Sequence, residues 1–483
     1  MIKRRKGVYA LFIPAFFLIY CMICGTAFAQ QAPALSPMMA DWIDEVEGGQ
    51  PANVTLSASL HSLVPFGDET LSMMNRLLSQ CKLNIGWQKT GGAEITRTQL
   101  MIGDENAIDI LEQSGNQALA QTSLLPGMTL SSYDGSPLSQ LLGSESEIPF
   151  WAAEAPDINA LSQKLPDAMS GLSSFAAEKE GSFKLLSVAT ARKALVYTVP
   201  ETNAEQLKDM LLKLASAMHW PEASTLFSSV ITKGDAEIML YQTSDGVNVG
   251  LGIKASIGFN NVSVRKVSFL WAFKSDAKKS VQSLSLKAPA ADGADYLTVA
   301  GDFVLENKKA KNTLSFDLDI KSRMDKEISQ EQWKGKLDCL LAEDNQRLEG
   351  EVKQTVSGSG EETYTLVIRP SLLAVRSGEE VSLKGNTRLT WGEGKSVLAD
   401  LTVSLSADQN ADLAFSSGGN VVSLSDMNAD ERATLAEKAQ NGAVTAIWQA
   451  LMALPEDALA LIKRNITQED WEKIYQVVYQ VGQ

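Results

Sequence analysis

The chain carries few side chains that could act as a catalytic base near neutral pH. Histidine is the usual general base, and the 483 residues include only His61 and His219. A triad would have to use one of them, and a zinc site would need carboxylates or cysteines to complete its ligands. A lone histidine is more often a packed or surface residue. Because no Gly-x-Ser-x-Gly, phosphate loop or dinucleotide fingerprint occurs either, the sequence predicts a non-enzymatic protein without a metal or a cofactor.

Paired carboxylates are the other groups that could do chemistry. Asp317 and Asp319 alternate along one predicted strand, and Glu349 and Glu351 alternate along another. Such pairs can transfer protons or hold calcium, but the water-facing side of a sheet is commonly acidic without a chemical role. The acidic turns also lack the Asp-x-Asp-x-Asp-Gly spacing of a calcium loop. We therefore interpret these carboxylates as solvated surface groups.

The first residues have the pattern of a bacterial secretory signal. Residues 3–6 are cationic, residues 8–24 form an apolar run, and Ala27-Phe28-Ala29 places small residues where a signal peptidase reads them. The run is long enough that an uncleaved membrane anchor remains an alternative. The sequence thus predicts export to the periplasm, the cell surface or the medium, with a membrane contacted only through this segment or as a neighbouring surface.

The rest of the chain is acidic and poor in cysteine. Cleavage after Ala29 leaves 39 of the 43 basic residues against 58 acidic residues, a formal net charge of −19. Such a chain repels nucleic acid, and an acidic surface without a pattern mainly confers solubility. Cys81 and Cys339 remain after cleavage. They could pair in an oxidising compartment or be two unrelated buried thiols, and the sequence leaves both alternatives open.

Long alternating segments between residues 296 and 407 predict strands. Apolar and polar residues alternate along residues 397–405, and a period of two places the apolar set on one face of a sheet. The same alternation recurs in residues 314–321 and 381–391. Short turns rich in charge and glycine separate these segments. The sequence therefore predicts an up-and-down antiparallel sheet with one dry face and one wet face.

Changes of pattern divide the chain into five portions. They are a signal peptide (1–29), an N-terminal α+β portion with a small antiparallel meander (30–150), a helical segment (151–235), a long antiparallel sheet (236–425) and C-terminal helices (426–483). The last helices carry apolar stripes that must be buried, so we expect them to pack on the apolar face of the long sheet. The predicted fold class is α+β: a long curved antiparallel up-and-down sheet covered by helices, with a smaller strand–helix–meander portion at the N-terminus.

This arrangement resembles the half-barrel superfamily of extracytoplasmic lipoprotein carriers. The signal segment, the strand–helix–meander start and the long one-sided strands carry the resemblance, which covers most of the mature chain in outline. It implies an open sheet that holds acyl chains under a helical lid. No functional residue is carried over, because no diagnostic motif matches.

A sheet face that helices cover incompletely leaves an apolar cavity. We therefore expect a non-enzymatic envelope protein that binds a hydrophobic or amphiphilic ligand, such as a lipid or an acyl chain, between the sheet and the helices. The predicted lining residues are Phe269, Trp271, Phe303, Phe316, Leu383 and Trp391. The alternative is a cell-surface structural or protein-interaction module with a solid core. A transmembrane barrel is disfavoured, because the chain ends in helices and lacks paired aromatic girdles.

Overall fold

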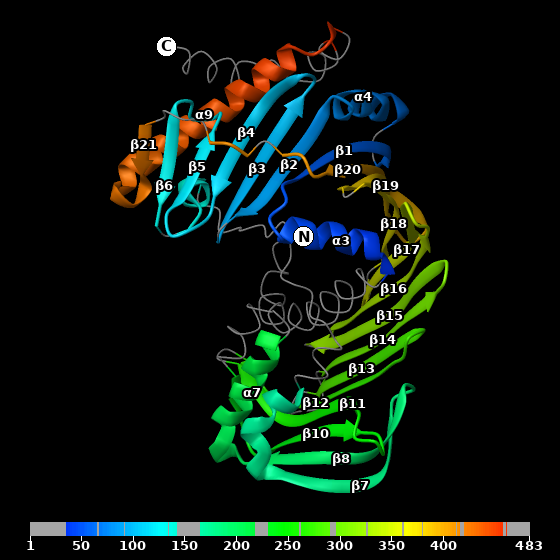
Figure 1. Cartoon of the computed structure of the whole chain (residues 1–483). Coiled ribbons are helices and arrows are strands. Elements are labelled where there is room, and N and C mark those ends of the chain that lie inside the picture. The colour runs from blue at the N-terminus through cyan, green and yellow to red at the C-terminus, as the bar shows by residue number, and fades with distance from the viewer. Residues whose placement is uncertain are drawn as a thin grey trace. The chain divides into compact units, whose positions relative to one another are not determined.

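The computed structural model describes the greater part of the chain (Figure 1). The described residues are 35–64, 67–90, 92–133, 135–142, 165–217, 230–259, 262–289, 296–324, 327–359, 362–378, 380–411, 413–415, 420–456 and 460. The predicted signal segment and His219 lie outside them. Among the residues described, no helix is both long and apolar enough to span a membrane.

The chain forms two compact units. Unit 1 comprises Met1–Pro37, Pro149–Ala342 and Leu348–Val367, and unit 2 comprises Met38–Ile148, Glu343–Arg347 and Ile368–Gln483. The two units are defined by contacts between residues, whereas the five predicted portions are defined by changes of sequence pattern. Those portions therefore remain a prediction.

Strands dominate the described residues, and 21 of them belong to one hydrogen-bonded sheet. The pairings in it are antiparallel apart from the parallel pair of β21 (Asn420–Ser423) with β6 (Met128–Ser132). The predicted α+β class with a helix-covered sheet is therefore wrong. The reason lies in β1 (Ala52–Leu63), which pairs with β2 (Cys81–Thr90) on one side and with β20 (Ser396–Asp408) on the other. The N-terminal meander is thus continuous with the long strands instead of standing beside them.

In unit 1 the register places apolar side chains on one face of successive strands. The strands are β7 (Ala176–Leu185), β8 (Ala189–Val199), β9 (Val230–Thr232), β10 (Ala236–Gln242), β11 (Asn248–Phe259), β12 (Val262–Ser275), β13 (Lys279–Pro289), β14 (Tyr296–Lys308), β15 (Lys311–Met324) and β16 (Glu327–Leu341). Trp271 lies opposite Leu284, and Phe303 lies opposite Phe316. β17 (Asn345–Gly358) and β18 (Tyr364–Ser377) each contribute residues to both units.

Two helical elements cover this face at one end of unit 1. The 3-10 turn η3 (Ser170–Phe175) and helix α7 (Ala204–Ala217), which follows the short turn η4 (Glu201–Asn203), pack on β8 and β10 to β12. Side chains from both sides are almost fully buried there: Leu172, Leu207, Met210, Ile238 and Leu240. Burying a side chain of this size contributes roughly 1.5–3 kcal/mol. The described helical elements of unit 1, η3 and α7, therefore stabilise one end of its strands.

The opposite face of the same strands is also apolar. Phe183 and Leu185 of β7 pack against Tyr241, Val249 and Ala272 in a second cluster. The predicted helical segment 151–235 thus contains the three strands β7, β8 and β9 among its described residues. The prediction missed β8 because its residues are apolar on both faces, which removes the period of two that marks a strand with one wet side.

Unit 2 contains the other end of the sheet and the longest described helix. Its remaining elements are α3 (Pro37–Glu47), α4 (Asp68–Leu78), β3 (Ala93–Ile102), β4 (Glu105–Gln113), β5 (Ala118–Thr122), α5 (Pro137–Leu142), β19 (Glu380–Glu393), η5 (Leu424–Asp426) and α9 (Ala429–Met452). Hydrogen-bonded pairs link β19, β20, β1, β2, β3, β4, β5, β6 and β21 in that order.

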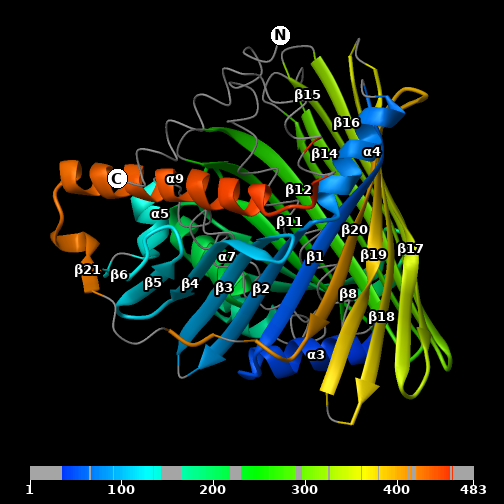
Figure 2. The same ribbon diagram turned by 90° about the horizontal axis from the view of Figure 1, so that it is seen from above.

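Helix α9 begins with a full capping box, in which Asn428 and Glu431 exchange hydrogen bonds between side chain and backbone. The sequence predicts that the C-terminal helices pack on strands of the 236–425 portion. Instead α9 packs on β3 and β4 of the meander, as Figure 2 shows. Its buried Leu435 and Ala450 meet Leu130 and Ile102, respectively, in two clusters. This apolar side of the meander continues the face of β1 and β20, since Leu83 lies opposite both Leu56 and Leu100, and the prediction overlooked it.

Candidate functional site

The histidine that the structure describes lies beside a hydroxyl group. Nε2 of His61 is 2.8 Å from Oγ1 of Thr402. Asp400, on the same strand as Thr402, accepts hydrogen bonds from Arg388 Nε at 2.9 Å and Arg388 Nη2 at 2.5 Å, and from Thr390 Oγ1 at 3.5 Å. The Arg388 hydrogen bonds lower the pKa of the Asp400 carboxyl, although burial opposes them. Asp400 is therefore engaged by Arg388 instead of orienting His61, and the group lacks the second link of a triad.

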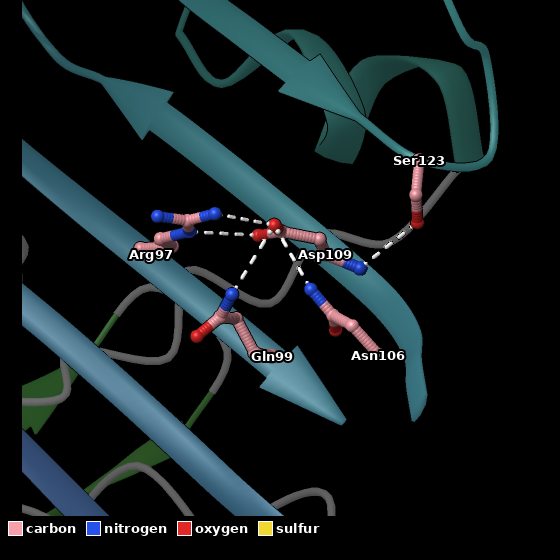
Figure 3. Close-up of polar contacts among 5 residues, drawn as sticks. All are labelled: Arg97, Gln99, Asn106, Asp109 and Ser123. Atoms are coloured by element: carbon pink, nitrogen blue, oxygen red, sulfur yellow. Dashed lines mark hydrogen bonds and ion pairs between the residues drawn. The ribbon is translucent and has the colours of Figure 1, made fainter. Parts of the chain in front are cut away.

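A second ion pair lies on β3 and β4 (Figure 3). The Asp109 carboxylate accepts hydrogen bonds from Arg97 Nε at 3.0 Å, Arg97 Nη2 at 2.6 Å, Gln99 Nε2 at 3.2 Å and Asn106 Nδ2 at 3.1 Å. The Asp109 backbone N–H donates to Ser123 Oγ at 2.9 Å. Burial raises the pKa of Asp109, but the Arg97 hydrogen bond and charge and the two amide donors outweigh it, so the pKa is lowered. These donors stabilise the ionised carboxylate, and the cluster ties β3 to β4.

Lysine side chains pair with two of the predicted carboxylates. Lys334 pairs with Asp317 at 3.0 Å, and Lys321 pairs with Asp319 at 2.7 Å. Across the described ranges, no three His, Cys, Asp or Glu side chains gather in a way that could hold a metal ion. Cys339 is buried and Cys81 is half-buried; both are free thiols, and burial raises the pKa of each.

The six predicted lining residues do not form one site. Phe269 and Trp271 are partly buried and pack against the buried cluster that α7 forms with β8 and β10 to β12. The centroids of the Trp271 and Phe273 rings are 4.6 Å apart. Phe303 and Phe316 are buried and stacked with ring centroids 6.2 Å apart. These four share one face of unit 1, as the alternation predicts. Leu383 and Trp391 belong to unit 2, where Trp391 is 46% exposed.

In unit 2 the apolar face of β1, β20 and β19 has a cover at each end. Hydrogen bonds and an ion pair join α3 to neighbouring strands through the pairs Met38–Gln346, Asp41–Arg376 and Glu45–Gln409. At the other end the Asn75 side chain of α4 accepts from Leu60 N at 2.6 Å and donates to Leu60 O at 2.5 Å. These bonds satisfy backbone groups where β1 bulges after Leu60.

Between these two helices the face is open to solvent in part. The register places three apolar rows side by side, each residue of them partly exposed: Leu56 with Leu405, Ala58 with Val403, and Leu60 with Leu401 and Leu389. Partly exposed Leu383 and exposed Trp391 extend the same face along β19. We call this set the apolar face of unit 2. The alternation of β1 and of β20 predicts both strands, but it does not predict that they pair, because they lie far apart in the sequence.

A separate pocket lies in unit 1, among the ends of β7, β8, β10, β11 and β12. Its volume is about 660 Å³, and none of the six predicted residues lines it. The lining residues combine apolar side chains with Lys184, Lys274 and Asp245. No sequence pattern marks this pocket, because its residues come from two turns and from the ends of strands that are separated in the sequence.

Comparison with known proteins gives no family for the chain. No family model and no curated protein matches. Solved structures that match include a loop-deletion mutant of OmpT, an outer membrane protein of Vibrio cholerae (6% identity, 74% of this chain and 97% of that chain, TM-score 0.26). Others are OccK3 of Pseudomonas aeruginosa (8%, 77% and 98%, 0.26) and the CymD monoaromatic hydrocarbon channel (8%, 80% and 94%, 0.22). TM-scores this low transfer neither fold nor function.

The resemblance to lipoprotein carriers is wrong. No family model of a carrier matches, and the solved structures named above include an outer membrane protein of Vibrio cholerae and no carrier.

Proposed function

We propose that the chain is an exported, non-enzymatic protein of the bacterial envelope that binds a hydrophobic or amphiphilic ligand on the apolar face of unit 2. One observation carries the proposal: adjacent rows of leucine, valine and alanine lie partly exposed between α3 and α4. Soluble proteins rarely leave a contiguous apolar surface exposed unless it binds something. A lipid or an acyl chain has the apolar, extended shape that such a surface suits.

Export rests on the N-terminal pattern of residues 3–29. The absence of enzymatic activity rests on the chemistry of the groups that could have supplied it. The His61–Thr402 pair has no orienting carboxylate, and both Arg–Asp pairs are saturated by hydrogen bonds.

The test places a charge in the middle of the apolar face. Val403 is partly exposed on this face, and Ser404, the next residue of β20, is exposed on the other face. We expect Val403→Glu to reduce binding of N-phenyl-1-naphthylamine at least ten-fold while Ser404→Glu leaves it unchanged. We also expect native mass spectrometry and solvent extraction of protein purified from its own host to recover a lipid. The proposal fails if no lipid is recovered and the probe does not bind the folded chain.

A second candidate, a structural or protein-interaction module with a solid core, is favoured by the packing of unit 1. The sequence predicts an apolar cavity on this face of unit 1, but the space is filled by Phe303, Phe316 and Gly335. This candidate predicts that neither unit binds the probe, so the same measurement decides between the two.

A further inference from the structure

The pocket in unit 1 has the dimensions of a small-molecule site. Its volume of about 660 Å³ falls within the usual range for ligand pockets, roughly 300–1,000 Å³. Two turns and a strand end surround it: residues 186–188 between β7 and β8, residues 243–247 between β10 and β11, and residues 273–275, the last residues of β12. The pocket lies wholly within unit 1 and is separate from the apolar face of unit 2.

The lining residues are amphipathic. Apolar side chains form one part of the lining: Leu186, Val188, Val247, Val249 and Phe273. Val247, at the turn between β10 and β11, is 60% exposed. Lys184 and Lys274 supply two positive charges and Asp245 one negative charge, so the lining is net positive in a chain of net charge −15. Asp276 also faces Lys274, and its pKa is lowered chiefly by the backbone N–H groups of Lys278 and Lys279.

The turn that carries Leu186 is held in an unusual conformation. Leu186 has φ +49°, and among the described residues it is the one non-glycine residue with a positive φ. Val188 N donates to Leu185 O at 3.2 Å, and Leu185 is buried beside Gly250, where an added Cβ would lie 2.9 Å from its Cδ1. A strained backbone conformation persists where the surrounding packing imposes it. Residues with such conformations are frequent at ligand sites. The anchored turn thus presents Leu186 and Val188 to the pocket in a fixed geometry.

We propose that this pocket binds a single-chain anionic amphiphile with a carboxylate head, such as a long-chain fatty acid. The carboxylate lies near Lys184 and Lys274, and the start of the hydrocarbon chain contacts Val247, Val249 and Phe273. Lysine ammonium groups recognise a carboxylate as point charges, so the interaction weakens with salt. The site is additional to the apolar face of unit 2, and neither depends on the other.

Tryptophan fluorescence of the full chain tests the proposal directly. Because the start of the bound chain contacts Phe273 and the Trp271 ring centroid lies 4.6 Å from that of Phe273, a bound 2-bromostearate, whose bromine is next to the carboxylate, lies near enough to quench Trp271. We expect saturable quenching that Trp271→Phe removes and that Lys184→Gln with Lys274→Gln weakens at least ten-fold in affinity. Lys254→Gln is the matched control, since Lys254 is an exposed lysine of β11 paired with Glu237 and does not line the pocket.

The outcomes separate this inference from the proposed function. Quenching that disappears only in Trp391→Phe assigns the amphiphile to unit 2, which overturns the inference and supports the proposed function. No quenching, or an affinity that the two lysine substitutions do not change, overturns the inference as well. Equal competition by oleate and by uncharged oleyl alcohol also overturns it, because the carboxylate then contributes nothing.

Discussion

The Phe316 ring of β15 lies directly over Gly335, its cross-strand partner on β16. A Cβ built on Gly335 would overlap Cε1 and Cζ of Phe316, so only glycine fits under the ring. Phe303 stacks on the other side of Phe316, with ring centroids 6.2 Å apart. Two residues that the sequence predicts as the lining of a cavity are therefore the packed centre of unit 1.

This contact predicts that Gly335→Ala destabilises unit 1. The added methyl forces the Phe316 ring from its position, and overpacking of this kind costs about 1–3 kcal/mol. Urea unfolding measures the loss. Gly171→Ala is the control, because a Cβ at Gly171 meets only a side-chain oxygen of Asp209, at 3.9 Å. If Gly335→Ala unfolds like the parent chain, the space below Phe316 is empty and the solid-core interpretation of unit 1 is wrong.

The Arg97–Asp109 cluster predicts a specific response to acid. The pKa of Asp109 is lower in the folded chain than its ordinary value of 3.8, so the ion pair stabilises unit 2 fully above pH 3.8. The contribution is lost as the pH falls from 3.8 through the folded pKa, because the unfolded chain takes up the proton first. Asp109→Asn should cost about 1–2 kcal/mol at pH 7, less than a fully buried pair because both side chains are partly exposed.

Unfolding measured from pH 2.5 to 7 checks this response. The difference between the parent chain and Asp109→Asn should shrink as the acid limit is approached. Glu105→Gln, at an exposed position of the same strand, should leave the profile unchanged. A difference that is constant over the whole range would show that the carboxylate acts only as a neutral hydrogen-bond acceptor.

Local alternation was enough to predict the long strands and which of their side chains share a face. Phe269, Trp271, Phe303 and Phe316 do lie on one face of unit 1 because a period of two determines this within each strand. The pairing of β1 with β20 could not be predicted, since both partners are ordinary one-sided strands and nothing local specifies which partner each takes. That pairing creates the apolar face of unit 2. The candidate site therefore could not be predicted from the sequence, apart from Leu383 and Trp391.

Asn75 links α4 to the bulge of β1, so its loss should lower stability at the edge of the apolar face of unit 2. Asn75→Ala leaves Leu60 N and Leu60 O without their partner, which should cost about 1–2 kcal/mol. We expect α4 to loosen and N-phenyl-1-naphthylamine binding to change together with stability. Ser72→Ala, exposed on the same helix, should alter neither quantity. An unchanged melt of Asn75→Ala would mean that water replaces the side chain at no cost.

Gly442 sets how closely α9 approaches the meander. A Cβ at Gly442 would lie 2.5 Å from the backbone oxygen of Leu124, a fixed atom that cannot turn aside as a side chain can. Helix propensity alone favours Gly442→Ala by about 1 kcal/mol. Overpacking against backbone opposes it by about 1–3 kcal/mol, so we expect a net loss of stability.

Thermal and urea unfolding of Gly442→Ala measure the net change in stability. Sedimentation shows whether the variant associates. Gln440→Ala is the control, since this exposed position gains helix propensity without any contact to lose and should be neutral or slightly stabilising. If Gly442→Ala is as stable as Gln440→Ala, α9 does not rest on the Leu124 backbone. The apolar cluster of Leu124, Leu125 and Leu130 would then need another cover.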